Sequence, residues 1–99
     1  MNIQINAVGF NADKKLEEYV ISKVEKVGKY FDGIVGAEVF LKLENGQSLE
    51  NKTSEVKLFI PGNDAFAKKT CKSFEEATDE AIEALKKQLE KYKEKIKRN

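Results

Sequence analysis

Apolar and polar residues alternate with a period of two in four segments, and this pattern predicts four β-strands. In the first segment Ile3, Ile5 and Ala7 fall on one side with amide side chains between them, which is typical of a half-buried strand. A turn rich in Pro, Gly and Asn at residues 61–64 separates the last two segments. The predicted strands cover residues 1–8, 37–43, 56–60 and 65–72.

Two longer segments repeat apolar residues at steps of three and four, which predicts amphipathic helices. The first covers residues 14–31 and follows Asp13, a good N-cap residue. The second begins at a capping box, in which the Ser73 hydroxyl accepts the Glu76 amide and the Glu76 carboxylate returns to Ser73. Its apolar stripe contains Phe74, Ala77, Thr78, Ala81, Ile82, Leu85, Leu89, Tyr92 and Ile96.

The order of these elements is strand, helix, three strands and helix, in a chain of 99 residues. That length predicts one domain, residues 1–99. Two apolar helix stripes and one apolar sheet face are typical of a two-layer sandwich. We therefore predict an α+β fold of pattern β-α-β-β-β-α. Both helices cover one face of a four-stranded sheet, and the last three strands form an antiparallel meander.

Composition argues against several kinds of chemistry. The chain has no His and a single cysteine, Cys71, so it lacks a Ser-His-Asp triad, a His-ligated zinc site and an internal disulfide. We interpret Cys71 as a small residue near a strand end, because no base can be named that would activate it. No apolar run approaches the ~18 residues of a membrane span, and the N-terminus lacks a signal-peptide pattern. These features predict a cytoplasmic binding protein, with no catalytic residue, metal, cofactor, membrane partner or small-molecule substrate.

Charge is distributed less evenly than its total suggests. The whole chain carries +1, from 18 basic and 17 acidic side chains. Residues 86–99 contain seven basic and two acidic side chains, a net +5, which leaves −4 for the other residues. This asymmetry favours a polyanionic partner. A solvated lysine-rich tail, or lysines that complement the negative end of the helix dipole, also explains it.

Helical spacing gathers lysines beside each apolar stripe. If the two helices pack side by side, these stripes combine into one basic groove that suits the phosphates of a folded RNA. Exposed lysines that merely keep a helix soluble are the alternative. The candidate RNA-binding residues chosen by spacing are Lys15, Lys23, Lys26, Lys29, Lys87, Lys91, Lys95 and Arg98.

The open sheet face offers a second candidate surface. Phe40, Phe59 and Phe66 are predicted to point away from the core, among lysines of the same strands. Aromatic rings among lysines on a sheet can stack RNA bases. A dimer interface or a set of cross-strand pairs that cover one another fits the pattern as well.

The chain resembles the ribosome hibernation-promoting factor family, also described as ribosome-associated inhibitor or ribosomal subunit interface proteins, over nearly its whole length. The most recognisable pieces are the helix segment 16–31 and the closing segment 81–93. In the family, basic residues recur at the places of Lys23, Lys26, Lys29 and Lys87, and an aromatic stands at the place of Tyr30. The resemblance implies a fold related to double-stranded-RNA-binding domains and adds Tyr30 to the RNA-binding residues.

The resemblance also implies a function. The partners are the small ribosomal subunit, with its 16S rRNA, and the 70S ribosome. The protein is expected to occupy the channel for mRNA and for the A- and P-site tRNAs under stress or in stationary phase, with no bond made or broken. The chain resembles the short form, a single ribosome-binding domain without a C-terminal dimerisation domain. The alternative is a general RNA-binding or protein-interaction module that uses the exposed sheet face.

Overall fold

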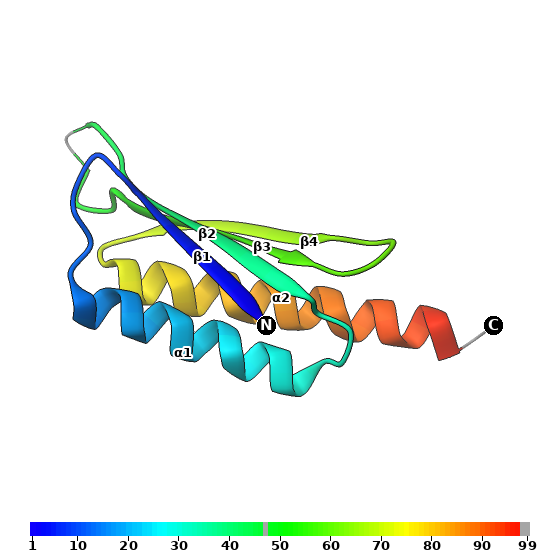
Figure 1. Ribbon diagram of the computed structural model, residues 1–99. Coiled ribbons are helices and arrows are strands. Elements are labelled where there is room, and N and C mark those ends of the chain that lie inside the picture. Colours follow the sequence, from blue (N-terminus) through cyan, green and yellow to red (C-terminus); the bar gives the residue numbers. More distant parts are fainter. Residues whose placement is uncertain (47, 98–99) are drawn as a thin grey trace.

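The elements of the protein follow the predicted order in a computed structural model that describes residues 1–46 and 48–97. Figure 1 shows one sheet above two helices. The elements are β1 (Asn2–Val8), α1 (Lys14–Tyr30), β2 (Gly36–Leu43), β3 (Lys52–Phe59), β4 (Ala65–Cys71) and α2 (Phe74–Lys97). The predicted two-layer α+β architecture is confirmed.

The four strands lie in the sheet in chain order. β1 pairs in parallel with β2, because α1 carries the chain back to the same end of the sheet. β2, β3 and β4 form the predicted antiparallel meander. The register aligns apolar side chains across the sheet: Val39 pairs with Ile5 on one side and with Val56 on the other.

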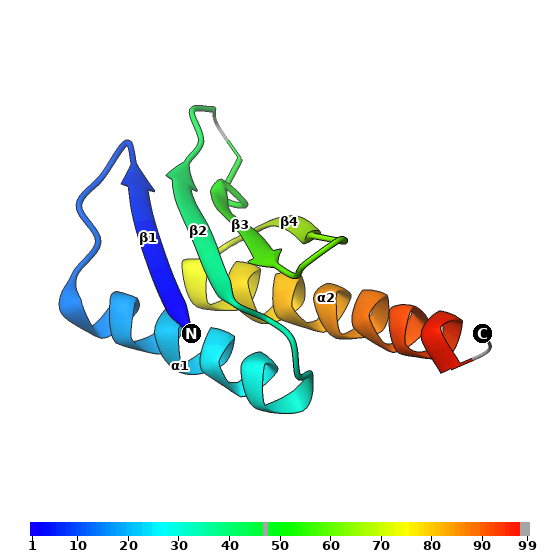
Figure 2. The ribbon, with the colours of Figure 1, turned by 45° about the vertical axis from the view of Figure 1, so that its right-hand side comes forward.

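Both helices cover the same face of the sheet and run in the same direction (Figures 1 and 2). The predicted apolar stripes of the helices meet the apolar sheet face in one core. Burial of these side chains from water is the main driving force for the fold. The fully buried residues of this core include Val20, Val24, Val27, Val39, Leu41, Val56, Leu58 and Leu85.

Both predicted N-caps are confirmed. The Asp13 carboxylate accepts a hydrogen bond from the Leu16 amide at 2.8 Å. The Ser73 hydroxyl accepts the Glu76 amide at 3.1 Å. The return bond from the Glu76 carboxylate stays a prediction. Each cap satisfies a backbone donor that has no partner inside its own helix.

Two details of the strands differ from the sequence pattern. β3 begins at Lys52, well before the apolar alternation, because buried polar residues continue the ladder. The Thr53 and Thr70 hydroxyls lie 2.7 Å apart, and the Thr78 hydroxyl donates to Ser54 at 3.1 Å. Ala7, predicted to face the core, is exposed, because it lies near the end of the edge strand β1.

Candidate nucleic-acid interface

A tyrosine, a carboxylate and a lysine join the two helices near their N-terminal ends. The Tyr19 hydroxyl lies 2.8 and 2.9 Å from the two carboxylate oxygens of Asp79. The Lys23 ammonium lies 3.4 Å from the same carboxylate. The hydrogen bond to Asp79 raises the pKa of Tyr19, and the charge of Asp79 raises the pKa of Lys23. The Lys23 charge is therefore engaged inside the protein.

A second pair of the same kind lies further along the helices. The Tyr30 hydroxyl donates to Glu90 at 2.7 Å, which raises the pKa of Tyr30. The Lys93 ammonium donates to the Tyr30 carbonyl at 3.3 Å and sits 4.9 Å from the centre of its ring. Tyr30, which the family resemblance assigned to RNA binding, thus contacts α2 through its hydroxyl.

The groove between α1 and α2 carries both signs of charge. It has a volume of about 280 Å³, and Lys23 and Lys26 enter it from α1. From α2 come Asp79, Glu83 and Lys86, with the Lys86 ammonium 3.5 Å from the Glu83 carboxylate. These carboxylates weaken the attraction of the groove for phosphate.

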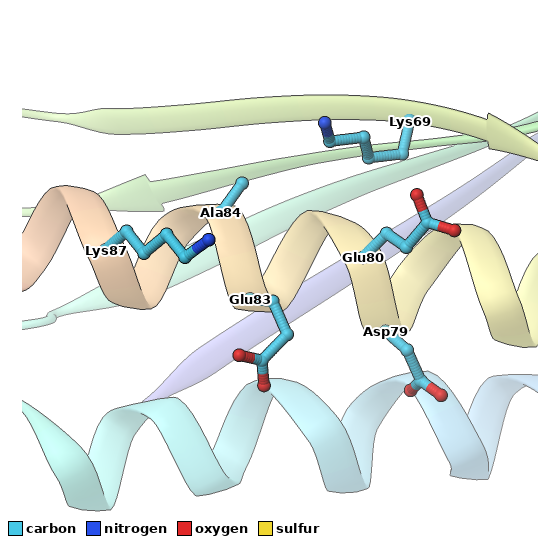
Figure 3. A pocket seen from close by; sticks show the side chains of 6 residues that line it. All are labelled: Lys69, Asp79, Glu80, Glu83, Ala84 and Lys87. Carbon is cyan, nitrogen blue, oxygen red and sulfur yellow. The ribbon is translucent and has the colours of Figure 1, made fainter.

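The combination of both lysine stripes in one groove stays a prediction. Lys87 lines a neighbouring groove of about 460 Å³ with Lys69 of β4 (Figure 3), and Asp79 and Glu83 line both grooves. Successive residues of a helix are turned by about 100°, so Lys86 faces α1 and Lys87 does not. Lys91, one turn beyond Lys87, continues on the Lys87 side.

The predicted lysines are nevertheless accessible. Lys23 is half-buried, Tyr30 is 40% exposed, and Arg98 lies outside the described residues. Lysine spacing failed to find Lys69 and Lys86, because neither belongs to the stripes chosen from the sequence. The exposed predicted lysines are Lys15, Lys26, Lys29, Lys87, Lys91 and Lys95.

Lysines on the open sheet face have partners within the sheet. The Lys42 and Lys68 ammonium groups lie 2.8 and 3.9 Å from the Glu55 carboxylate, which raises the pKa of Lys42. Lys42 also covers the Phe40 ring, at 5.8 Å from its centre. Phe66 is 50% exposed on the same face. The ion pairs of Glu55 are cross-strand contacts, whereas the contact of Lys42 with Phe40 lies within β2.

The structure supports the non-nucleophilic interpretation of Cys71. It is the last residue of β4, it is buried, and its thiol donates to the Glu80 carboxylate at 3.1 Å. Burial and Glu80 raise the pKa of Cys71 from 9.0 to about 11. A thiol so protonated is a poor nucleophile.

Among the described residues, no cluster of three or more His, Cys, Asp or Glu side chains is arranged to hold a metal ion. Within the same part of the chain, neither helix has the length and apolar character needed to cross a bilayer.

Two relatives match almost the full length of the chain. A ribosome hibernation promoting factor of Escherichia coli K12 is 32% identical over 99 residues, covering 98% of this chain and 100% of the relative. A protein of the same name from Pseudomonas putida is 32% identical over 95 residues, covering 96% of this chain and 89% of the relative.

Two solved structures share the fold. A ribosomal subunit interface protein from Coxiella burnetii superposes with a TM-score of 0.81, at 22% identity, over 94% of this chain and 98% of the other. The N-terminal domain of Protein Y from Thermus thermophilus gives a TM-score of 0.78, at 22% identity, over 93% of this chain and 99% of the other. The profile of the family described as Sigma 54 modulation protein / S30EA ribosomal protein matches residues 3–97. This chain therefore belongs to that family, together with the relatives named ribosome hibernation promoting factor.

Proposed function

We propose that this protein is a ribosome hibernation factor that binds the small ribosomal subunit and the 70S ribosome. In this proposal it contacts 16S rRNA through the outer surface of its helix layer and occupies the channel for mRNA and the A- and P-site tRNAs. Occupation of the channel excludes initiation by steric competition, so translation stops reversibly under stress or in stationary phase. Family membership and the names of the relatives support this function.

The observation that carries the proposal is the difference between the two faces of the molecule. On the helix layer Lys26, Lys29 and Lys91 are exposed to solvent. On the sheet face Lys42 and Lys68 are paired with Glu55. When a solvated lysine binds an RNA phosphate, a counterion of the RNA is released, and this release favours binding. A lysine already paired with a carboxylate contributes less to the affinity. The helix layer is therefore the surface that suits an RNA partner.

Sedimentation with purified ribosomal particles tests the proposal. The wild-type protein should co-migrate with 30S and 70S particles. Replacing Lys26, Lys29 and Lys91 by Glu should abolish co-migration without unfolding the domain, because these side chains are exposed. Lys57→Glu on the sheet face is the control for charge reversal and should keep co-migration. Initiator tRNA bound to 30S particles should decrease as the protein is added.

The rival function is a general RNA-binding or protein-interaction module that uses the sheet face. The exposed Phe66 is the observation in its favour. In that case Phe40→Ala with Phe59→Ala would abolish binding while the triple lysine variant still bound. Binding to naked RNA without ribosome association would also favour the module.

A further inference from the structure

Two side-chain hydrogen bonds hold the edge strand β4 along α2. The Cys71 thiol donates to Glu80 at 3.1 Å, and the Gln88 amide donates to the Phe66 carbonyl at 2.9 Å. The strand and the helix run in opposite directions between these contacts, so Lys69 lies beside the helix segment between Glu80 and Gln88. This arrangement places a strand lysine beside the middle of α2, where the lysine-rich C-terminal part of the helix begins.

Lys69 and Lys87 line the groove on this flank from its two ends. Figure 3 shows both amino groups reaching toward Ala84, which lies between them. The small Ala84 side chain leaves the space above it open, and the groove volume is about 460 Å³. The two lysines are exposed at the surface. The site thus has two cations around a cavity with a small apolar floor.

Three carboxylates, those of Asp79, Glu80 and Glu83, also line this groove. Asp79 and Glu83 extend toward α1 in Figure 3. Asp79 is engaged by Tyr19 there. Glu80 accepts the hydrogen bond from Cys71. The carboxylates of the groove therefore belong to the N-terminal half of α2, and the space above Ala84, between the two lysines, is the place for an anion.

We propose that Lys69 and Lys87 hold one phosphate of the small-subunit RNA above Ala84. This inference rests on the proposed function and extends it: the RNA contact is not confined to the outer helix surface but continues around α2 to the rim of β4. Phosphates spaced along an RNA backbone suit lysines that follow one another along a helix flank, and Lys91 extends the line from Lys87.

A matched pair of variants in adjacent residues tests the site. Lys69→Gln removes the charge at the groove, and Lys68→Gln removes the same charge from the opposite face of β4. Binding of labelled protein to 30S particles is titrated between about 50 and 200 mM monovalent salt at fixed magnesium. Lys69→Gln should weaken binding about five- to tenfold near 100 mM salt and make the log–log slope shallower by about 0.7 to 0.9, the value of one phosphate contact.

The control separates this site from a general effect of charge. Lys68→Gln should stay within about twofold of wild type and keep its salt slope. Equal behaviour of the two variants, with normal wild-type binding, would overturn the second phosphate site and leave the proposed function intact. Failure of the wild-type protein to bind 30S would overturn the proposed function and this site with it. Lys69→Glu, with its folding checked by circular dichroism, should weaken binding further, and unchanged binding by that variant would also count against the site.

Discussion

The Tyr19 hydroxyl on α1 lies 2.8 and 2.9 Å from the carboxylate oxygens of Asp79 on α2, across 60 positions of sequence. Tyr30 repeats the contact with Glu90 across the same 60 positions. Eleven residues make about three turns of helix, so the two pairs lie on one line along the interface. The parallel helices are thereby held in one register, which fixes the positions of the lysines on their outer surface.

Tyr19→Phe should lower the free energy of unfolding by about 1 kcal/mol, because it removes a part-buried hydrogen bond to a carboxylate. Tyr30→Phe is the matched control and should cost less, because its hydrogen bond to Glu90 is exposed to water. Urea denaturation monitored by circular dichroism measures both. An equal cost for the two variants would contradict the greater weight given to the Tyr19 contact.

Asp79→Asn should affect stability and ribosome binding in opposite directions. The neutral amide weakens the contacts of Tyr19 and Lys23, so the unfolding midpoint in urea should fall. The same change releases Lys23 and removes a negative charge from the groove, so 30S particles should be bound about two- to fivefold more tightly at low salt. Glu38→Gln on the sheet face is a control of equal charge and should leave ribosome affinity unchanged. Weaker binding by Asp79→Asn in a folded protein would contradict the assigned role.

Cys71 should resist alkylation in the folded protein. Its pKa is raised from 9.0 to about 11, so at pH 8 the thiolate fraction is about 100-fold smaller than in the unfolded chain. Iodoacetamide modification followed by mass spectrometry should therefore be slow in buffer and fast in urea. Rapid labelling of the folded protein would show that the thiol is neither buried nor held by Glu80.

The same shift predicts the direction of a pH dependence. The folded state retains the Cys71 proton more strongly than the unfolded state does. The contribution of the protonated Cys71 thiol to the free energy of unfolding is therefore fully present below pH 9 and is lost as the pH rises through about 11. Cys71→Ser, whose hydroxyl does not titrate in this range, should show a smaller loss of stability between pH 9 and 11 in urea denaturation.

The features that the sequence predicted well are local ones. Asp13 and Ser73 cap helices through contacts with residues three positions away, so the local sequence is enough to predict both caps. The apolar stripes likewise depend only on the period of the helix. β3 began earlier than its apolar pattern because Thr53 and Ser54 are buried with polar partners, a case that hydropathy misses.

The placement of the lysines depends on how the helices are rotated against their neighbours, and helical spacing alone does not determine that rotation. Lys86 and Lys87 are adjacent in sequence but line different grooves on α2. Lys69 lies in β4, and only the packing of β4 against α2 places it in the same groove as Lys87. Contacts over 60 positions, such as Tyr19 to Asp79, have no local signal at all.

The salt dependence of ribosome binding tests the central claim most directly. If the exposed lysines of the helix layer neutralise phosphates, the log of the affinity for 30S particles should fall linearly with the log of the salt concentration. Five or six contacts predict a slope of about −4 between about 50 and 200 mM monovalent salt at fixed magnesium, although the protein is near neutral overall. Docking through the sheet-face aromatics predicts a shallow slope with a negative heat-capacity change. A slope near −4 supports the helix-layer interface, and a slope near zero would contradict it.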